Sequence, residues 1–109
     1  MKFLIIARDR PNGPYPPDPA SLNRAVREWV GARLSDGTFD CAYYLLPRAG
    51  MCIANAESHE ALLSLLRSWP SFGYQEFDIN VLADARHGID NNHERLQREA
   101  AKSKAEDGT

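Results

Sequence analysis

Two residues could move a proton on a small molecule, Glu28 and His87. A carboxylate or an imidazole is the usual group for general acid–base catalysis. Glu28 falls in a predicted helix, where a surface residue paired with Arg24 is the simpler alternative. His87 follows the last predicted strand and could act at the mouth of a pocket, although a loop histidine without a chemical role is the simpler alternative. Both are candidate catalytic residues.

Three further side chains could hold a substrate, Arg48, Tyr43 and Tyr44. Arg48 falls at the tip of a predicted hairpin, and its guanidinium could bind a carboxylate through two parallel hydrogen bonds. The two tyrosines could donate from a strand into a cavity. A solvated turn arginine and core tyrosines with one satisfied hydroxyl are the ordinary alternatives.

Other kinds of site leave no pattern in the sequence. The histidines His59, His87 and His93 show no metal-ligand spacing, and the two cysteines form no CxxC. There is no glycine-rich phosphate loop and no G-x-S-x-G motif. We therefore expect neither a metal nor a cofactor.

Composition narrows the class of protein. The chain has 109 residues, which suits one domain, and its formal net charge of −2 does not suggest a nucleic-acid partner. No apolar run approaches the roughly 20 residues that a membrane span needs. The opening apolar run is too short for a signal peptide, so a cytoplasmic protein is expected.

The first elements that must position these residues are a strand and a helix. The branched apolar run at residues 2–8 predicts a strand, and five prolines within residues 10–19 predict a stiff loop. Asp18 as a cap and Pro19 at the first helical position start a helix over residues 19–34. The apolar stripe of this helix is predicted to contain Leu22, Ala25, Val26, Trp29 and Val30, with Asn23, Arg24, Arg27 and Glu28 away from it.

A hairpin follows, with strands at 38–47 and 51–56 and a turn at 48–50. Pairing Leu46 with Met51 sets the cysteines Cys41 and Cys52 about four residues out of register, too far apart for a disulfide. The same pairing distributes large apolar side chains over both faces of the hairpin. One face is predicted to carry Tyr44, Leu46, Met51 and Ile53, and the other Cys41, Tyr43, Leu45 and Cys52.

The second half repeats a helix and a strand. Ser58 caps a helix whose buried stripe is Leu62, Leu65, Leu66 and Trp69, and Pro70 ends it. Phe72 is expected to return the chain to the core, and residues 73–82 form the last strand. The tail is polar and is expected to form a helix that docks on a neighbouring subunit or frays.

The order β-α-β-β-α-β predicts an α+β, ferredoxin-like sandwich at residues 1–88, with a polar C-terminal extension at residues 89–109. Two helices cover one face of the sheet, and the other face also carries apolar residues. Self-association through that face is the simplest way to bury it.

At these residues the sequence resembles the muconolactone isomerase family. The resemblance covers about residues 1–88 and is sharpest at 58–82. It rests on the helix end, the aromatic lead into an acidic-apolar strand and an Arg-His pair: Leu62, Leu65, Pro70, Phe72, Tyr74, Phe77, Asp78, Ile79, Arg86 and His87.

The resemblance implies a dimeric α+β barrel, sometimes assembled into decamers, that moves a proton on a small unsaturated lactone without metal or cofactor. Two features depart from the family. Its catalytic glutamate falls on Val26 in this chain, and its tyrosine and asparagine between the hairpin strands are replaced by residues 47–50.

The sequence thus favours a cofactor-free isomerase or lyase whose substrate is a small organic acid or lactone other than muconolactone. A non-catalytic ligand-binding or assembly protein and a cofactor-independent monooxygenase are the alternatives, because a fold alone does not decide among them. The expected partners are a small-molecule ligand and further copies of the chain, without nucleic acid or membrane.

Overall fold

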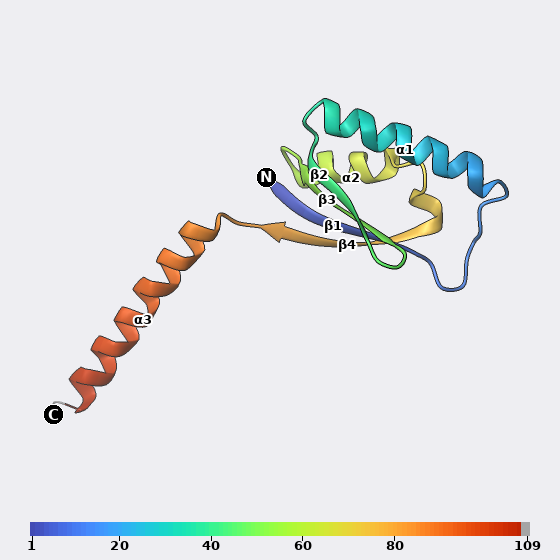
Figure 1. The fold of residues 1–109 in the computed structure, drawn as a ribbon. Helices are drawn as coiled ribbons and strands as arrows, with labels where there is room; N and C mark the ends of the chain where they lie inside the picture. Colours follow the sequence, from blue (N-terminus) through green and yellow to red (C-terminus); the bar gives the residue numbers. More distant parts are fainter. Residues whose placement is uncertain (108–109) are drawn as a thin grey trace.

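The computed structural model describes residues 1–107, and its elements follow the predicted order (Figure 1). They are β1 (Lys2–Asp9), α1 (Pro19–Ser35), β2 (Phe39–Leu45), β3 (Ala49–Asn55), α2 (His59–Ser68), a short 3₁₀ helix η1 (Phe72–Tyr74), β4 (Gln75–Leu82) and α3 (Ala85–Asp107). The strands form one sheet in the order β2-β3-β1-β4, with antiparallel neighbours throughout. Helices α1 and α2 cover one face, so the α+β, ferredoxin-like fold is confirmed.

Both covering helices begin at the predicted caps. The Asp18 carboxylate accepts a hydrogen bond from the Ser21 amide at 3.1 Å, and the Ser58 hydroxyl accepts one from the Ala61 amide at 3.0 Å. Each bond satisfies an amide that the first helical turn leaves without a partner. α2 ends where Trp69 adopts an extended backbone before Pro70, because a residue that precedes proline avoids the helical region.

Aromatic rings join the helices to the sheet. Trp69 is 7% exposed, and its ring centroid lies 4.9 Å from that of Trp29, 5.7 Å from that of Phe39 and 5.2 Å from that of Phe77. Phe72 stacks on Phe77 at 5.9 Å. The predicted packing roles of Trp69 and Phe72 at the end of α2 are therefore confirmed.

The predicted register of the hairpin is wrong by three residues. Tyr43 lies opposite Met51, and Leu45 lies opposite Ala49, so the turn comes earlier in the chain than expected. The physical reason is Pro47, which has no amide to donate to the ladder and therefore lies in the turn rather than at the end of a strand.

The new register also changes the relation between the cysteines. Cys41 lies opposite Ile53, the residue next to Cys52, so the offset is one residue rather than four. Cross-strand partners share a face and successive residues alternate, so the two side chains point to opposite faces of the sheet. Both cysteines are free thiols, but the separation that we expected along the strands is not the cause.

The predicted distribution of side chains over the two hairpin faces changes as well. Ala42, Tyr44 and Cys52 face the helices, because Ala42 pairs with Cys52 and Cys52 pairs with Ile5 of the core. The opposite face, called here the open face, carries apolar residues from three strands: Leu4, Ile6, Cys41, Tyr43, Met51 and Ile53.

The last helix starts at Ala85, earlier than the sequence suggested, and includes Arg86 and His87 in its first turn. It projects away from the rest of the molecule (Figure 1). No helix within residues 1–107 is long and apolar enough to cross a membrane. The last two residues of the predicted extension, 108–109, lie outside the described part of the chain.

Candidate functional site

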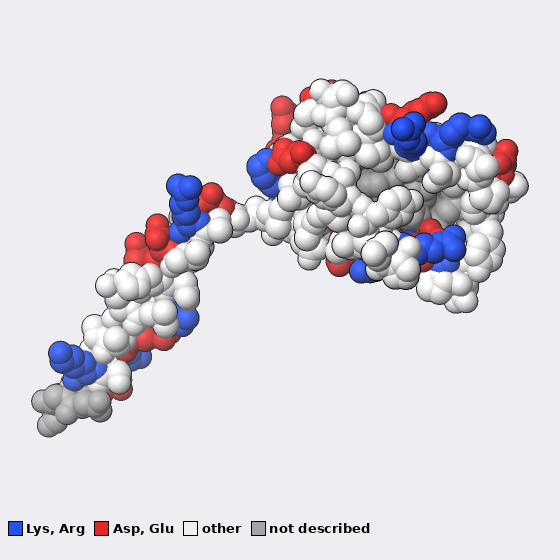
Figure 2. Space-filling view, in the orientation of Figure 1, with Lys and Arg blue, Asp and Glu red and all other residues white. Residues whose placement is uncertain are grey.

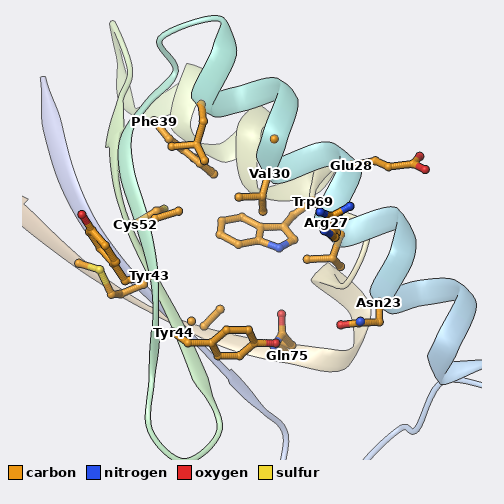
Figure 3. A pocket seen from close by; sticks show the side chains of 17 residues that line it. Asn23, Arg27, Glu28, Val30, Phe39, Tyr43, Tyr44, Cys52, Trp69 and Gln75 are labelled. Atoms are coloured by element: carbon orange, nitrogen blue, oxygen red, sulfur yellow. The ribbon is translucent and has the colours of Figure 1, made fainter.

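A cavity of about 760 Å³ lies between α1 and the helix-facing side of the sheet (Figure 3). This volume is within the range of small-molecule sites in proteins. Its walls come from α1, from the hairpin, from the end of α2 and from the start of β4. The residues that matter below are Asn23, Val26, Arg27, Glu28, Val30, Phe39, Ala42, Tyr43, Tyr44, Cys52, Trp69 and Gln75.

The helix α1 forms one wall because it rests on the sheet through only part of its length. Trp29 and Val30 pack against the core, whereas α1 has no fully buried residue. The cavity-lining side chains Asn23, Val26, Arg27 and Val30 recur at three- and four-residue spacing, so they share one helix face. Asn23 and Arg27 are exposed, as expected for residues away from the apolar stripe, but they also line the cavity.

Three of the five predicted site residues line the cavity. Glu28 does so from α1, but its carboxylate is directed away from the interior (Figure 3). Tyr44 lies at the mouth and is 77% exposed. Tyr43 contributes from the neighbouring position on β2, and its ring extends toward the open face, where Met51 is its cross-strand partner.

The other two predicted site residues lie elsewhere. Arg48 forms an ion pair with Asp9, with 3.0 Å between Nε and Oδ2, and so connects the hairpin turn to the end of β1. His87 is exposed in the first turn of α3, where its backbone amide donates to the Asp84 carboxylate at 3.0 Å. Neither residue belongs to the cavity wall.

One buried polar atom of this wall was not predicted from the sequence. The indole nitrogen Nε1 of Trp69 is buried, and no hydrogen-bond acceptor lies within its reach in residues 1–107. A buried indole N–H usually finds a partner, because leaving a donor unpaired is unfavourable. The sequence shows that a core tryptophan needs an acceptor for its N–H, but it does not show whether an acceptor lies near.

The charged groups of the cavity lie on its rim. Figure 2 shows basic and acidic side chains along the edge of α1, above a hollow whose walls are largely uncharged. Arg27 and Glu28 take part in none of the ion pairs formed within the described chain, so the expected pairing of Glu28 with Arg24 is absent. Arg27 is therefore free to bind an anion.

The cysteine in the cavity wall is not a nucleophile. Burial raises the pKa of Cys52 to about 12, and the nearby Cys41 adds to the shift. The thiolate is the reactive form of cysteine, and it is essentially unpopulated at neutral pH with such a pKa. Among residues 1–107, no cluster of three or more His, Cys, Asp or Glu could hold a metal ion. What the cavity offers is hydrogen-bond donors, one cation and one carboxylate.

No protein-family model and no curated protein sequence matches this chain. Solved structures do. Muconolactone isomerase superposes with a TM-score of 0.66 at 23% identity, over 77% of this chain and 90% of that one. A 5-chloro-2-hydroxyhydroquinone dehydrochlorinase from Burkholderia phenoliruptrix AC1100, in complex with 2,5-dihydroxybenzoquinone, superposes with a TM-score of 0.54 at 19% identity, over 80% of this chain and 98% of that one. At these identities the likeness shows the fold alone, and at that level the resemblance stated from the sequence is confirmed.

Proposed function

We propose that this chain, which has the fold of muconolactone isomerase, is a cofactor-free isomerase or lyase that transfers a proton on a small organic acid or lactone other than muconolactone. The observation that carries the proposal is the cavity, where an unpaired cation and a carboxylate, Arg27 and Glu28, flank an interior with apolar walls. Both fold neighbours are enzymes that act on small organic molecules, which supports the isomerase or lyase class.

Binding would begin at the rim. The Arg27 guanidinium would attract the carboxylate of the substrate, and a charge-assisted hydrogen bond would fix its orientation. The Asn23 amide and the Tyr44 hydroxyl line the same cavity and supply neutral donors. A ligand that fills the apolar interior would displace water from it and so strengthen the interactions that reach inside.

Proton transfer would then require a base, and Glu28 is the carboxylate on the cavity wall. Rotation of its side chain toward the interior would bring it to a C–H bond adjacent to a substrate carbonyl. The proton passes to Glu28, and the negative charge on the enolate oxygen is stabilised by the donors. Return of the proton to another carbon completes an isomerisation, whereas departure of a leaving group completes an elimination.

His87, the other candidate base, lies on the projecting α3. It would reach a cavity only if α3 packed on another copy of the chain. Its role is therefore tied to assembly, and Glu28 is the first residue to test.

A non-catalytic ligand-binding protein is the second candidate. The observation in its favour is the direction of the Glu28 carboxylate, which points away from the interior (Figure 3). Without a base that faces the ligand, the cavity would bind and release a molecule unchanged.

We also propose that copies of this chain pair through their open faces, in a dimer or a larger assembly. The open face carries half-buried apolar side chains such as Leu4, Ile6 and Met51. Arg8 of β1 lies on that face opposite Glu76 of β4, and Asp78 of β4 lies opposite Ile6, so a twofold pairing of opposite charges is available. A cytoplasmic location, expected from the sequence, stays part of this proposal.

Deuterium exchange tests the catalytic proposal without knowledge of the substrate. Small unsaturated lactones and the corresponding acids are incubated with the protein in D₂O, and loss of C–H signals is followed by proton NMR. We expect exchange that is lost in Glu28→Gln and kept in Glu60→Gln, a matched change in the first turn of α2. Binding without exchange in the wild-type protein would favour the non-catalytic alternative, and exchange that survives Glu28→Gln would exclude Glu28 as the base.

A further inference from the structure

The Trp69 indole carries a donor that the folded chain does not use. The residue is more than nine-tenths buried, its Nε1 atom has no acceptor among the described residues, and its ring forms part of the cavity wall. Figure 3 shows the indole lying in the space between α1 and the hairpin. A donor left in this state costs free energy, and an acceptor supplied by a ligand would recover it.

The Gln75 side chain, which lines the same cavity, is already engaged. The Gln75 side-chain oxygen accepts from the Ser71 hydroxyl at 2.6 Å, and the Gln75 amide nitrogen donates to Asp9 at 3.4 Å. Gln75 is thus held in place by two partners and is not aimed at the indole. A molecule in the cavity could supply the acceptor that Trp69 lacks among the described residues.

The shape of the cavity indicates what kind of molecule this is. Trp69, Phe39 and Tyr44 present aromatic rings to the interior. A cavity of about 150 Å³ holds one benzene ring, and this one has about 760 Å³. A flat ligand of two rings would therefore fit with room to spare, with one of its faces against the aromatic side chains.

The charge on the rim indicates the polarity of the ligand. Arg27 is a cation on the cavity wall without an ion-pair partner in the described chain. Arg27 and the indole N–H are therefore two donors that could bind oxygen atoms of a ligand. The nitrogen of Trp69 is covered, so a ligand acceptor would reach it only after a small shift of the wall.

We propose that the cavity selects a flat, conjugated acid of up to about two rings, with one ligand oxygen accepting a hydrogen bond from Trp69 Nε1 and the negative charge of the ligand held by Arg27. The proposal rests on the cavity of the proposed function and names the class of ligand for it. Trp69 is then a binding residue as well as a core residue.

The experiment uses 2-naphthoate as the probe and the full chain labelled with ¹⁵N. The chain has two tryptophans, so two indole N–H signals are expected, and Trp29→Phe assigns them by removing one. We expect 2-naphthoate to move the Trp69 signal downfield, as a new hydrogen bond does, and to leave the Trp29 signal nearly unchanged. The matched probe 2-naphthylmethylammonium has the same rings and the opposite charge, and it should bind more than tenfold more weakly.

Affinity measurements by calorimetry add a second readout. Trp69→Phe keeps an aromatic ring and removes the N–H, so it should weaken 2-naphthoate binding about tenfold, whereas Trp29→Phe should change it less than twofold. Arg27→Gln should weaken binding by a similar factor and reduce its dependence on salt. Circular dichroism verifies that each variant is folded. The NMR experiment on the wild-type protein tests the proposal even if a variant at a binding residue fails to fold.

Two results would overturn the inference. If 2-naphthoate binds in the cavity, as shown by loss of binding in Val26→Trp, but neither moves the Trp69 signal nor distinguishes Trp69→Phe, then Trp69 is not the donor and the cavity remains a binding site. If 2-naphthoate does not bind at millimolar concentration, then the ligand class is wrong. Neither result bears on the proposed proton transfer, because the deuterium exchange assay tests that reaction independently.

Discussion

The indole rings of Trp29 and Trp69 lie with their centroids 4.9 Å apart, and this contact joins α1 to the end of α2. It matters because α1 has no fully buried residue of its own, so its position over the sheet depends on few contacts. Trp69 also lines the cavity, whereas Trp29 does not. Trp69 therefore contributes to the stability of the core and, as proposed above, to ligand binding.

The Trp69→Ala substitution should lower the free energy of unfolding by roughly 3–5 kcal/mol, the usual cost of emptying a core aromatic site. The ring contacts of Trp69 with Trp29, Phe39 and Phe77 would all be lost. Urea denaturation followed by circular dichroism measures the change. Tyr15→Ala is the control, since Tyr15 is 75% exposed, and equal stability of Trp69→Ala and the wild-type protein would show that the ring cluster does not hold the fold together.

The protein should be at least a dimer at micromolar concentration, because the open face otherwise leaves apolar side chains in water. Light scattering gives the mass directly. Ile53→Lys places a charge in the middle of that face, opposite Leu4 and Cys41, and should yield monomers. Tyr15→Lys, a change in the exposed loop before α1, should leave the mass unchanged, and a monomeric wild-type protein would contradict the prediction.

Asp40 should contribute to stability at neutral pH and lose that contribution in acid. Hydrogen bonds from Lys2 and from Asn55 lower the pKa of the Asp40 carboxyl. The unfolded chain has the ordinary pKa of about 3.9. The stabilisation is therefore complete above that value and disappears as the pH falls through the lowered pKa of the folded state.

Denaturation curves at several pH values between about 5 and 2 test this expectation. Asp40→Asn should flatten the acid side of the stability profile, and Lys2→Gln should do so in part because it removes the strongest partner. An acid profile of Asp40→Asn that matches the wild-type profile would show that the exposed network is too weak to matter.

Cys52 should resist thiol reagents in the folded protein. Its pKa is raised from 9.0 to about 12, so its thiolate fraction near pH 8 is about a thousandfold lower than that of an ordinary cysteine. In Cys41→Ser, labelling by Ellman's reagent should be slow in buffer and fast in urea. In Cys52→Ala the half-buried Cys41 should react first, and rapid labelling of folded Cys41→Ser would contradict the burial of Cys52.

Muconolactone should not be turned over, or only in traces. Val26 lines the cavity at the position where the family resemblance puts the catalytic glutamate, and valine cannot accept a proton. General-base catalysis is typically worth about 10²–10⁴-fold. An ultraviolet assay on muconolactone, with Glu28→Gln and His87→Ala alongside, measures the rate. Turnover at the level of a true isomerase would show that another residue replaces the glutamate, and loss in one variant would identify it.

The fold was predictable because local patterns decide it. The caps Asp18 and Ser58 mark where two helices start, and Pro70 marks where one ends, since each acts through its own backbone. The hairpin register was not predictable in the same way. Pro47 lies in the turn because it has no amide to donate to the ladder, but the sequence does not show which of the two pairings buries more of the sheet.

The candidate site was predictable only in part. Glu28, Tyr43 and Tyr44 were identified because their residue types are typical of acid–base chemistry and binding, and they line the cavity. Asn23 and Arg27 were assigned to the solvent side, because an amphipathic pattern tells which residues are polar but not how far a helix stands from the sheet. Trp69 was identified for its packing, whereas its unused donor becomes visible only when its neighbours are known.

The projecting α3 gives the chain the hydrodynamics of a much larger particle. The described chain extends 73 × 33 × 26 Å and has a radius of gyration of 20.3 Å, whereas a compact chain of this length has about 13 Å. A single copy with this shape would have high friction and would elute early from a sizing column, at a volume that suggests a compact dimer. If two copies pair through their sheets, each contributes an arm, and the longest interatomic distances in small-angle X-ray scattering would then come from the arms rather than from the paired sheets.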